Sequence, residues 1–249
     1  MLFSPLEQFQ IFTLKVETLG PLDFSLTNAS LTILLAVGFF IFICQRISDF
    51  GLSFLPNRWQ LFGENLYKLV ADLLNNTTGK SGQKYFPFIF TLFALVLLFN
   101  SLGLTPYSFT VTSHLNQTLV LAIIVFIGTV YIAYSLHGSN MLGTFLPGGA
   151  PLALGFLLVP IEIVSYVFKP LSLSVRLFAN MMAGHTLLKV IAGFAWSMLN
   201  LKGWYFVAYL VPLLILVILY FLELAVALIQ AYVFTVLSCI YINDSINLH

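Results

Sequence analysis

Two apolar stretches near the end of the sequence are far longer than one membrane crossing requires. They run from Leu152 to Met198 and from Tyr205 to Ile242. A transmembrane helix needs about 20 residues. At ~1.5 Å per residue, these stretches would instead reach roughly 70 Å and roughly 57 Å as straight helices. An ordinary tilt of about 20° does not absorb this excess. Residues 152–249 are therefore predicted to form an unusual pair of long helices.

Three explanations of this length remain open on the sequence alone. The helices tilt strongly, they bend, or their ends lie outside the membrane. If they bend, the bends would lie at the prolines of the two stretches, Pro160, Pro170 and Pro212. We favour two steeply tilted helices that are joined at Leu199–Gly203.

The composition agrees with a chain that lies mostly in lipid. Hydrophobic residues make up 60% of the 249 residues and charged residues only 8%, whereas a soluble domain carries about 25% charged residues. A net charge of +1 gives no reason to expect a nucleic-acid partner. Cys44 and Cys239 lie in apolar runs, which is typical of packing residues rather than of a disulfide or a metal site. No two histidines share one predicted membrane helix, so a haem cofactor is not expected.

Shorter apolar runs, each long enough for one crossing, occupy Leu26–Cys44, Phe86–Leu104 and Thr118–Leu136. Between the first two, the stretch Arg58–Leu74 carries apolar residues at helical spacing with charged residues between them. That pattern predicts an amphipathic helix lying flat on the membrane surface. Residues Asn75–Gln83 are expected to form a polar loop.

These segments define the predicted fold class and orientation. We expect an all-α integral membrane protein, a single membrane domain of residues 1–249. It has five transmembrane helices, the last two long and steeply tilted, plus one amphipathic surface helix. Basic residues collect on the inner side of membranes, and half of the ten Lys and Arg residues lie between the first and second crossings. They are Arg46, Arg58, Lys68, Lys80 and Lys84. The N-terminus is therefore expected outside and the C-terminus inside.

Ionisable residues interrupt both long apolar stretches. A charge at the bilayer centre costs at least ~2.5–3.5 kcal/mol, so such residues usually face a polar path. Those residues are Glu162, Lys169, Arg176, His185, Lys189, Glu223 and Asp244. Spacings of seven residues, nearly two helical turns, or multiples of seven predict two stripes. One runs through Glu162, Lys169 and Arg176, and the other through Glu223, Gln230 and Asp244. Asn180 extends the first stripe. His185 lies nine residues after Arg176 and points to the opposite side.

Structural explanations compete with a polar path for several of these residues. Lys169 and Lys189 are long enough to extend their ammonium groups to lipid headgroups. Asp244 is close to the C-terminus and fits an ordinary hydrated helix end. His185 and Glu223 fit a neutral pair in the core. Arg176 is harder to explain structurally, because it lies in the middle of its run and its guanidinium stays charged.

The segment Lys169–His185 resembles the signature of subunit a of F-type ATP synthases, S-x-x-x-R-L-x-x-N-x-x-A-G-[HE]. The segment Leu222–Val233 is similar to the last helix of that family, E-x-x-x-x-x-x-Q-[AG]-Y-[VI]. Weaker similarities lie at Tyr85–Leu92 and Asn100–Tyr107. The joint pattern covers most of the chain and is highly specific.

The resemblance implies a proton-translocating stator subunit beside a rotating ring of c-subunits, each with one carboxylate. Arg176 is then the essential fixed cation beside which that carboxyl group gives up its proton. A guanidinium suits this role because it stays charged and binds carboxylates with two hydrogen bonds. The remaining site residues follow from the same resemblance. The outer half-channel contains His185, Glu223 and Asn100, the matrix half-channel contains Glu162 and Asp244, and Asn180 and Gln230 flank Arg176.

Partners and location also follow from the resemblance. The expected partners are the c-subunit rotor ring, the peripheral-stalk subunit b, small membrane subunits and lipids such as cardiolipin. The transported ion is the proton, and neither a cofactor nor a metal is expected. A His at position 185 with a Glu at position 223 is typical of mitochondrial members. This favours the mitochondrial inner membrane, with the N-terminus in the intermembrane space and the C-terminus in the matrix. The start of the sequence shows no targeting leader, which agrees with synthesis inside the organelle.

Two other functions compete with this interpretation. A secondary transporter would show inverted repeats, and no second copy of the polar-striped helix is present in the sequence. A purely structural membrane subunit would give no purpose to Arg176, Asn180, His185 and Glu223. Co-purification with a ring of small subunits would separate these functions.

Overall fold

The computed structural model describes residues 4, 6–16, 18–19, 22–23, 25–49, 57–105, 108–138, 143, 152–199 and 209–247. These residues are mostly helical. The chain divides into two compact units, each built from three separate stretches. Unit 1 comprises Met1–Ile41, Leu95–His114 and Leu177–Ala231, and unit 2 comprises Phe42–Ala94, Leu115–Arg176 and Tyr232–His249.

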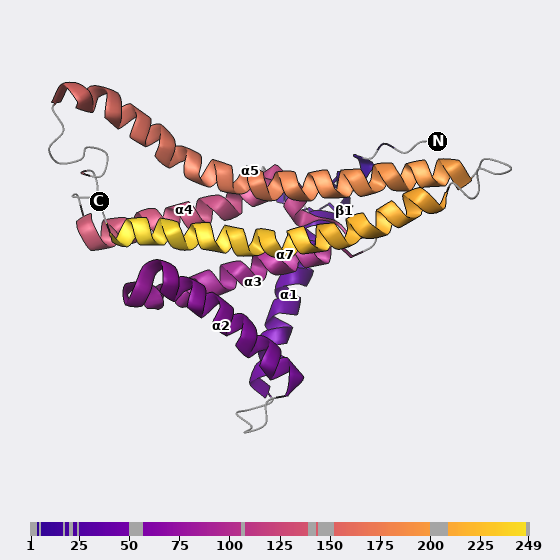
Figure 1. The fold of residues 1–249 in the computed structure, drawn as a ribbon, viewed down its shortest axis with the longest axis horizontal. Helices are drawn as coiled ribbons and strands as arrows, with labels where there is room; N and C mark the ends of the chain where they lie inside the picture. The colour runs from indigo at the N-terminus through magenta and orange to yellow at the C-terminus, as the bar shows by residue number, and fades with distance from the viewer. Residues whose placement is uncertain are drawn as a thin grey trace. The chain divides into compact units, whose positions relative to one another are not determined.

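Six α-helices and three short 3-10 helices are present in the described part of the chain (Figure 1). The α-helices are α1 (Asn28–Asp49), α2 (Arg58–Thr78), α3 (Phe86–Gly103), α4 (Leu115–His137), α5 (Leu152–Leu199) and α7 (Leu210–Ile246). The 3-10 helices are η1 (Glu7–Phe9), η2 (Gly79–Tyr85) and η3 (Val111–Ser113). Five helical segments are long and apolar enough to cross a membrane, as the sequence predicts.

Helices α5 and α7 have 48 and 37 residues, which confirms the long pair. Pro160 and Pro170 lie inside α5, so neither ends the helix. Pro212 lies in the first turn of α7, where the missing N–H of proline has no intrahelical partner to lose. Helix α7 therefore begins at Leu210, before this proline, and continues to Ile246. The predicted connection at Leu199–Gly203 lies almost entirely outside the described residues.

The predicted polar loop at Asn75–Gln83 is wrong. Helix α2 continues to Thr78 and leads directly into η2. The hydroxyls of Thr77 and Thr78 donate to carbonyl oxygens one turn earlier, which satisfies these polar side chains within the helix. Gly79 ends α2 with a φ of 65°, a conformation that glycine adopts without strain.

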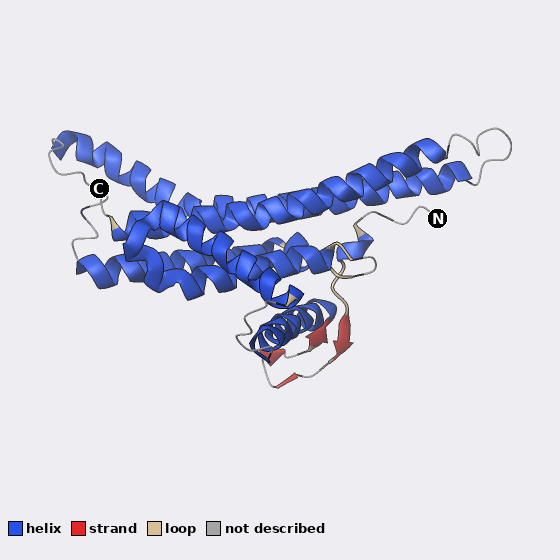
Figure 2. Cartoon of the chain, turned by 60° about the horizontal axis from the view of Figure 1, so that its bottom comes forward, coloured by secondary structure: helices blue, strands red, loops and turns tan. Residues whose placement is uncertain are grey.

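The N-terminal region of unit 1 contains short strands that the sequence did not predict. Strand β1 (Thr13–Lys15) pairs antiparallel with β4 (Leu26–Thr27), and β2 (Thr18–Leu19) pairs with β3 (Leu22–Asp23). Figure 2 shows these strands in red beside α1. The Asn28 side chain accepts a hydrogen bond from the Phe12 N–H and donates one to the Gln10 carbonyl. These two bonds tie the start of α1 to the chain before β1.

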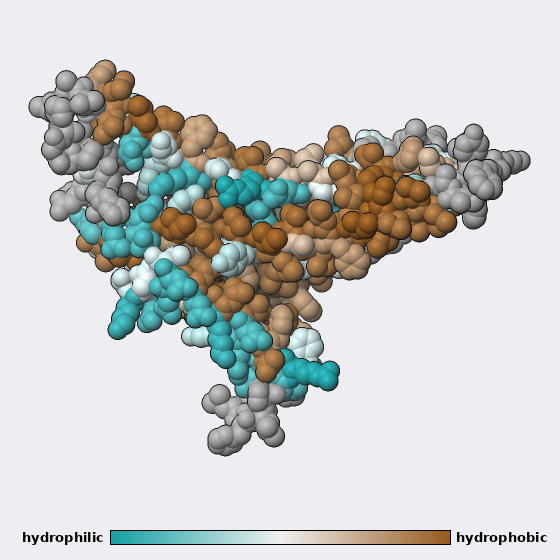
Figure 3. Space-filling model, viewed as in Figure 1, coloured by the Kyte–Doolittle hydropathy of each residue, from teal (hydrophilic) through white to brown (hydrophobic). Residues whose placement is uncertain are grey.

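In unit 1, the second part of α5 and the first part of α7 run side by side (Figure 1). The end of α3 joins them, since Leu104, Met181 and Ala227 pack in one buried cluster. Exposed hydrophobic side chains cover the first part of α7, for example Leu214 and Phe221 (Figure 3). This is the surface expected of a helix surrounded by lipid or by other apolar helices.

In unit 2, aromatic pairs join neighbouring helices. The Tyr67 ring of α2 lies 4.6 Å from the Phe86 ring of α3, and the Phe126 ring of α4 lies 5.1 Å from the Tyr166 ring of α5. Helix α2 is amphipathic as predicted: hydrophilic side chains gather along it in Figure 3, while Val70, Leu73 and Leu74 are buried. Its predicted position on the membrane surface stays a prediction.

Candidate functional site

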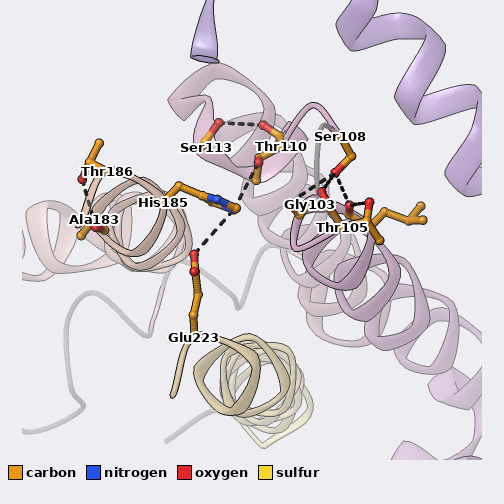
Figure 4. Close-up of polar contacts among 10 residues, drawn as sticks. Gly103, Thr105, Ser108, Thr110, Ser113, Ala183, His185, Thr186 and Glu223 are labelled. Atoms are coloured by element: carbon orange, nitrogen blue, oxygen red, sulfur yellow. Dashed lines mark hydrogen bonds and ion pairs between the residues drawn. The ribbon is translucent and has the colours of Figure 1, made fainter. Parts of the chain in front are cut away.

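His185 on α5 and Glu223 on α7 face each other in unit 1 (Figure 4). The Nε2 atom of His185 lies 3.6 Å from Oε1 of Glu223, and their side chains are 14% and 5% exposed. This distance exceeds a hydrogen bond. Neither carboxylate oxygen of Glu223 has a hydrogen-bond partner among the described residues. A buried polar group left without a partner is costly, so this pair is poorly explained as a static core contact.

Gly184 makes room for the Glu223 carboxyl group. A Cβ atom at position 184 would lie 2.6 Å from Oε1 of Glu223 and 3.0 Å from its Cδ. Real side chains do not approach this closely, so only glycine allows the carboxyl group to lie directly against α5. The glycine therefore places Glu223 beside the next residue of α5, which is His185.

Thr110 is a site residue that the sequence analysis missed. Its Oγ1 lies 3.2 Å from Nε2 of His185, the same nitrogen that faces Glu223. Thr110 belongs to a run of buried hydroxyl residues around η3, together with Thr112 and Ser113. In the sequence, the only indication of this role is that these three hydroxyl residues lie together between two predicted membrane crossings. Composition alone did not indicate which of them reaches the histidine.

Asn100 is fully buried at the end of α3, and its Nδ2 donates a hydrogen bond to the Ala227 carbonyl of α7 at 3.2 Å. Ala227 lies one turn after Glu223, so this bond joins α3 to α7 close to the His185–Glu223 pair. Asn180 and Gln230 also meet in unit 1, where Nδ2 of Asn180 donates to Oε1 of Gln230 at 2.8 Å. The structure thus brings together the helices that carry the predicted outer residues.

A second polar group lies in unit 2. Nζ of Lys169 lies 3.1 Å from Oδ2 of Asp244, and the ammonium also lies over the rings of Tyr166 and Tyr241. Lys169 thus has an acidic partner within its own chain, which the structural explanation by lipid headgroups did not include. Glu162 is exposed on α5, and no hydrogen bond or ion pair of the described residues joins it to Asp244.

Arg176 lies on α5 in unit 2 and is exposed. Within the described ranges it forms no ion pair with an acidic residue. A structural arginine in an apolar helix would normally be paired with a carboxylate of its own chain. Arg176 is therefore a permanently charged group whose carboxylate partner is not among the described residues.

The chemistry of these groups is that of proton transfer and ion pairing. A histidine and a carboxyl group can each take up and release a proton, whereas the arginine stays charged. The described residues contain no group of three or more His, Cys, Asp or Glu placed to hold a metal ion.

Comparisons with known proteins agree on one family. Residues 27–243 match the family described as ATP synthase A chain. A protein of Pylaiella littoralis named ATP synthase subunit a is 58% identical over 249 residues, which is 100% of both chains. A protein of Chondrus crispus with the same name is 49% identical over 246 residues, covering 99% of this chain and 97% of the relative. A protein of Paramagnetospirillum magneticum, also so named, is 43% identical over 249 residues, 99% of each chain.

Proposed function

Because the chain belongs to the family of ATP synthase subunit a, we propose that its intramembrane polar residues form the proton path of a rotary ATP synthase. The chain is a multi-pass membrane protein and the proton-translocating stator subunit of the membrane sector. It works in a complex with other subunits. The assignment of individual residues to the proton path is the proposal developed below.

Arg176 is the stator cation of this proposal. The observation that carries it is an exposed guanidinium on an apolar helix without an acidic partner among the described residues. A rotor subunit that presents one carboxylate would supply the missing partner. That carboxylate must be neutral to face lipid, and it ionises beside the arginine because an adjacent positive charge favours the charged form. The guanidinium also repels protons, which prevents them from passing directly between the two sides.

His185, Glu223 and Asn100 form the path on the outer side. The 3.6 Å separation of His185 and Glu223 allows a proton to pass between them after a small side-chain rotation. Glu162 and Asp244 release protons on the inner side, where Lys169 holds Asp244. Along the sequence, Asn180 lies between Glu162 and His185 on α5, and Gln230 lies between Glu223 and Asp244 on α7. Their mutual hydrogen bond joins the two helices at this level.

The partners and location follow from the same proposal. Residues 152–249 face a ring of c-subunits. The peripheral-stalk subunit b, small membrane subunits and lipids such as cardiolipin cover other surfaces. The membrane is the mitochondrial inner membrane, with the N-terminus on the intermembrane side and the C-terminus in the matrix. The inner-membrane assignment rests on the His185–Glu223 arrangement, and the orientation of the termini rests on the basic residues between the first and second crossings.

The replacement of Arg176 by Ala tests the proposal. Proton-driven ATP synthesis in membrane vesicles should fall to background, while the amount of subunit that co-purifies with the rotor ring stays near the parent level. Arg176→Lys should recover little activity, since an ammonium cannot bind a carboxylate with the two parallel hydrogen bonds of a guanidinium.

Arg58→Ala provides the matched control, because Arg58 is an exposed arginine at the start of α2. This variant should synthesise ATP at close to the parent rate. A near-normal rate in Arg176→Ala would contradict the proposal.

A further inference from the structure

The Thr110 hydroxyl makes a contact that differs from those of other hydroxyls in unit 1. Thr105, Thr186 and Ser197 each donate to a backbone carbonyl three residues earlier, at 2.7, 2.9 and 2.8 Å. Oγ1 of Thr110 instead lies 3.2 Å from Nε2 of His185, which is 75 residues away in sequence. Figure 4 shows the His185 ring pointing between Thr110 and Glu223.

Thr110 makes this contact in place of a local one. It is the N-cap residue of η3, a position where a threonine hydroxyl commonly accepts a hydrogen bond from a backbone N–H of the first turn. No such side-chain bond is present at η3. The Thr110 carbonyl serves the local structure, since it accepts bonds from the N–H and from the hydroxyl of Ser113. The hydroxyl is therefore left for the histidine.

The surroundings of Thr110 hold its side chain in this orientation. The residue is 5% exposed. A Cβ atom at Gly103 would lie 2.7 Å from Cγ2 of Thr110, so the threonine methyl packs directly on the Gly103 backbone. A β-branched side chain has few χ1 rotamers. With the methyl held against Gly103 and the carbonyl held by Ser113, the hydroxyl stays directed at His185.

We propose that Thr110 is a positioning residue for His185, and that its hydroxyl keeps the imidazole beside Glu223 in both protonation states of the ring. This rests on the proposed role of His185 and Glu223 in the proton path. A hydroxyl both donates and accepts. It donates to Nε2 when that nitrogen is bare and accepts from Nε2–H after the ring takes up a proton. An ionised carboxylate only accepts, so Glu223 alone cannot hold the bare nitrogen.

Within the described part of the chain, each element at this contact carries a charged or titratable group. Glu223 on α7 is the one that the structure places against His185. Lys189 lies one turn later on α5, and His114 lies at the end of η3. Burial lowers the pKa of His114, so His114 stays neutral near pH 7. None of these groups changes when Thr110 is substituted, so an altered dependence on external pH reports on the hydroxyl itself.

Three substitutions of Thr110 separate the hydroxyl from the methyl group. Thr110→Ser keeps the hydroxyl and loses the methyl, Thr110→Val keeps the shape and loses the hydroxyl, and Thr110→Ala loses both. Proton-driven ATP synthesis per assembled complex should fall about fivefold in the Val and Ala variants, the effect expected from one lost hydrogen bond. It should fall less in the Ser variant, which keeps the hydroxyl but loses the methyl contact with Gly103. Thr105→Val is the matched control in the same segment and should synthesise ATP normally.

Two further measurements distinguish positioning from a structural role. If the outer side is made more acidic, the deficit of Thr110→Val relative to the parent should shrink, because slow proton uptake is relieved by more protons. A folding defect would instead lower the rate by a constant factor. In a His185→Ala background, Thr110→Val should cause no additional loss, because the residue acts through the histidine.

These variants distinguish a failure of the proposed role of His185 from a failure of the inference about Thr110. A parent-like rate in His185→Ala would overturn the proposed function of His185, and the role of Thr110 with it. A slow His185→Ala together with parent-like Thr110→Val and Thr110→Ala would overturn the inference about Thr110 alone. So would equal losses in the Ser and Ala variants, or a pH-independent deficit.

Discussion

Nδ2 of Asn180 on α5 donates a hydrogen bond to Oε1 of Gln230 on α7, at 2.8 Å. The two residues differ in burial, since Gln230 is 3% exposed and Asn180 is exposed. Nε2 of Gln230 is buried and has no hydrogen-bond partner among the described residues. The bond therefore satisfies the oxygen of a buried amide and fixes its orientation, with the nitrogen directed away from Asn180.

The loss of Asn180 should destabilise the contact between α5 and α7 in unit 1. Asn180→Ala leaves the Gln230 oxygen buried without a donor, at a cost of about 1–3 kcal/mol. The double variant Asn180→Ala with Gln230→Leu removes both partners and should cost less than the sum of the single changes. The midpoint of thermal inactivation of the purified complex measures all three variants. Strictly additive effects would contradict the coupling.

Gly184→Ala should impair proton transport without changing any ionisable group. The new Cβ would lie 2.6 Å from Oε1 of Glu223, so the carboxyl group must move away from its place beside His185. We expect proton-driven synthesis to fall about tenfold or more, as a displacement of about 1 Å can cost a hundredfold in well-oriented sites.

Gly193→Ala is the control for this substitution. Gly193 lies on the same helix and in the same unit, and a Cβ there would meet no atom within 4 Å. It should leave the synthesis rate unchanged, or raise stability slightly through the better helix propensity of alanine. Equal rates in the two alanine variants would show that the space at Gly184 is unimportant.

The amount of assembled subunit should depend on opposite charges at positions 169 and 244. Both side chains are partly exposed, at 35% and 46%, so the pair itself should contribute at most about 1 kcal/mol. Lys169→Asp places two carboxylates in contact and should reduce the amount of assembled subunit. The exchange of both residues, Lys169→Asp with Asp244→Lys, should restore assembly, as measured by co-purification with the rotor ring. It should not restore ATP synthesis, because position 244 then carries no carboxyl group. Failure of the exchange to improve assembly would mean that the contact is incidental.

The main features of the fold were predictable because the physics of the bilayer leaves few choices. A backbone in hydrocarbon must satisfy its own hydrogen bonds, so the apolar runs could only become helices. The ends of α5 lie within one residue of the predicted ends at Leu152 and Met198. The strands before α1 and the helical turns after Leu74 were not predictable in this way. They depend on local bonds such as those of Asn28 and Thr78, which leave no periodic pattern in the sequence.

The candidate site was predictable to a similar degree. Helical spacing together with the family resemblance identified His185, Glu223, Asn180 and Gln230, and the structure brings these residues together in pairs. Spacing within one segment says nothing about Thr110, whose contact with His185 joins segments 75 residues apart. The role of Gly184 was also not predictable, because the glycine acts by leaving space for the Glu223 carboxyl group. Both require three-dimensional coordinates.

We propose that protons reach the rotor through two paths open to opposite sides of the membrane. The most direct test labels single cysteines with a membrane-impermeant thiol reagent, in a chain whose Cys44 and Cys239 are replaced by Ser. Thr186→Cys places the thiol beside His185, and Ser165→Cys places it three residues after Glu162. We expect the thiol at position 186 to react only from the outer side and that at position 165 only from the inner side. Reaction of both positions from the same side would contradict the two-path account.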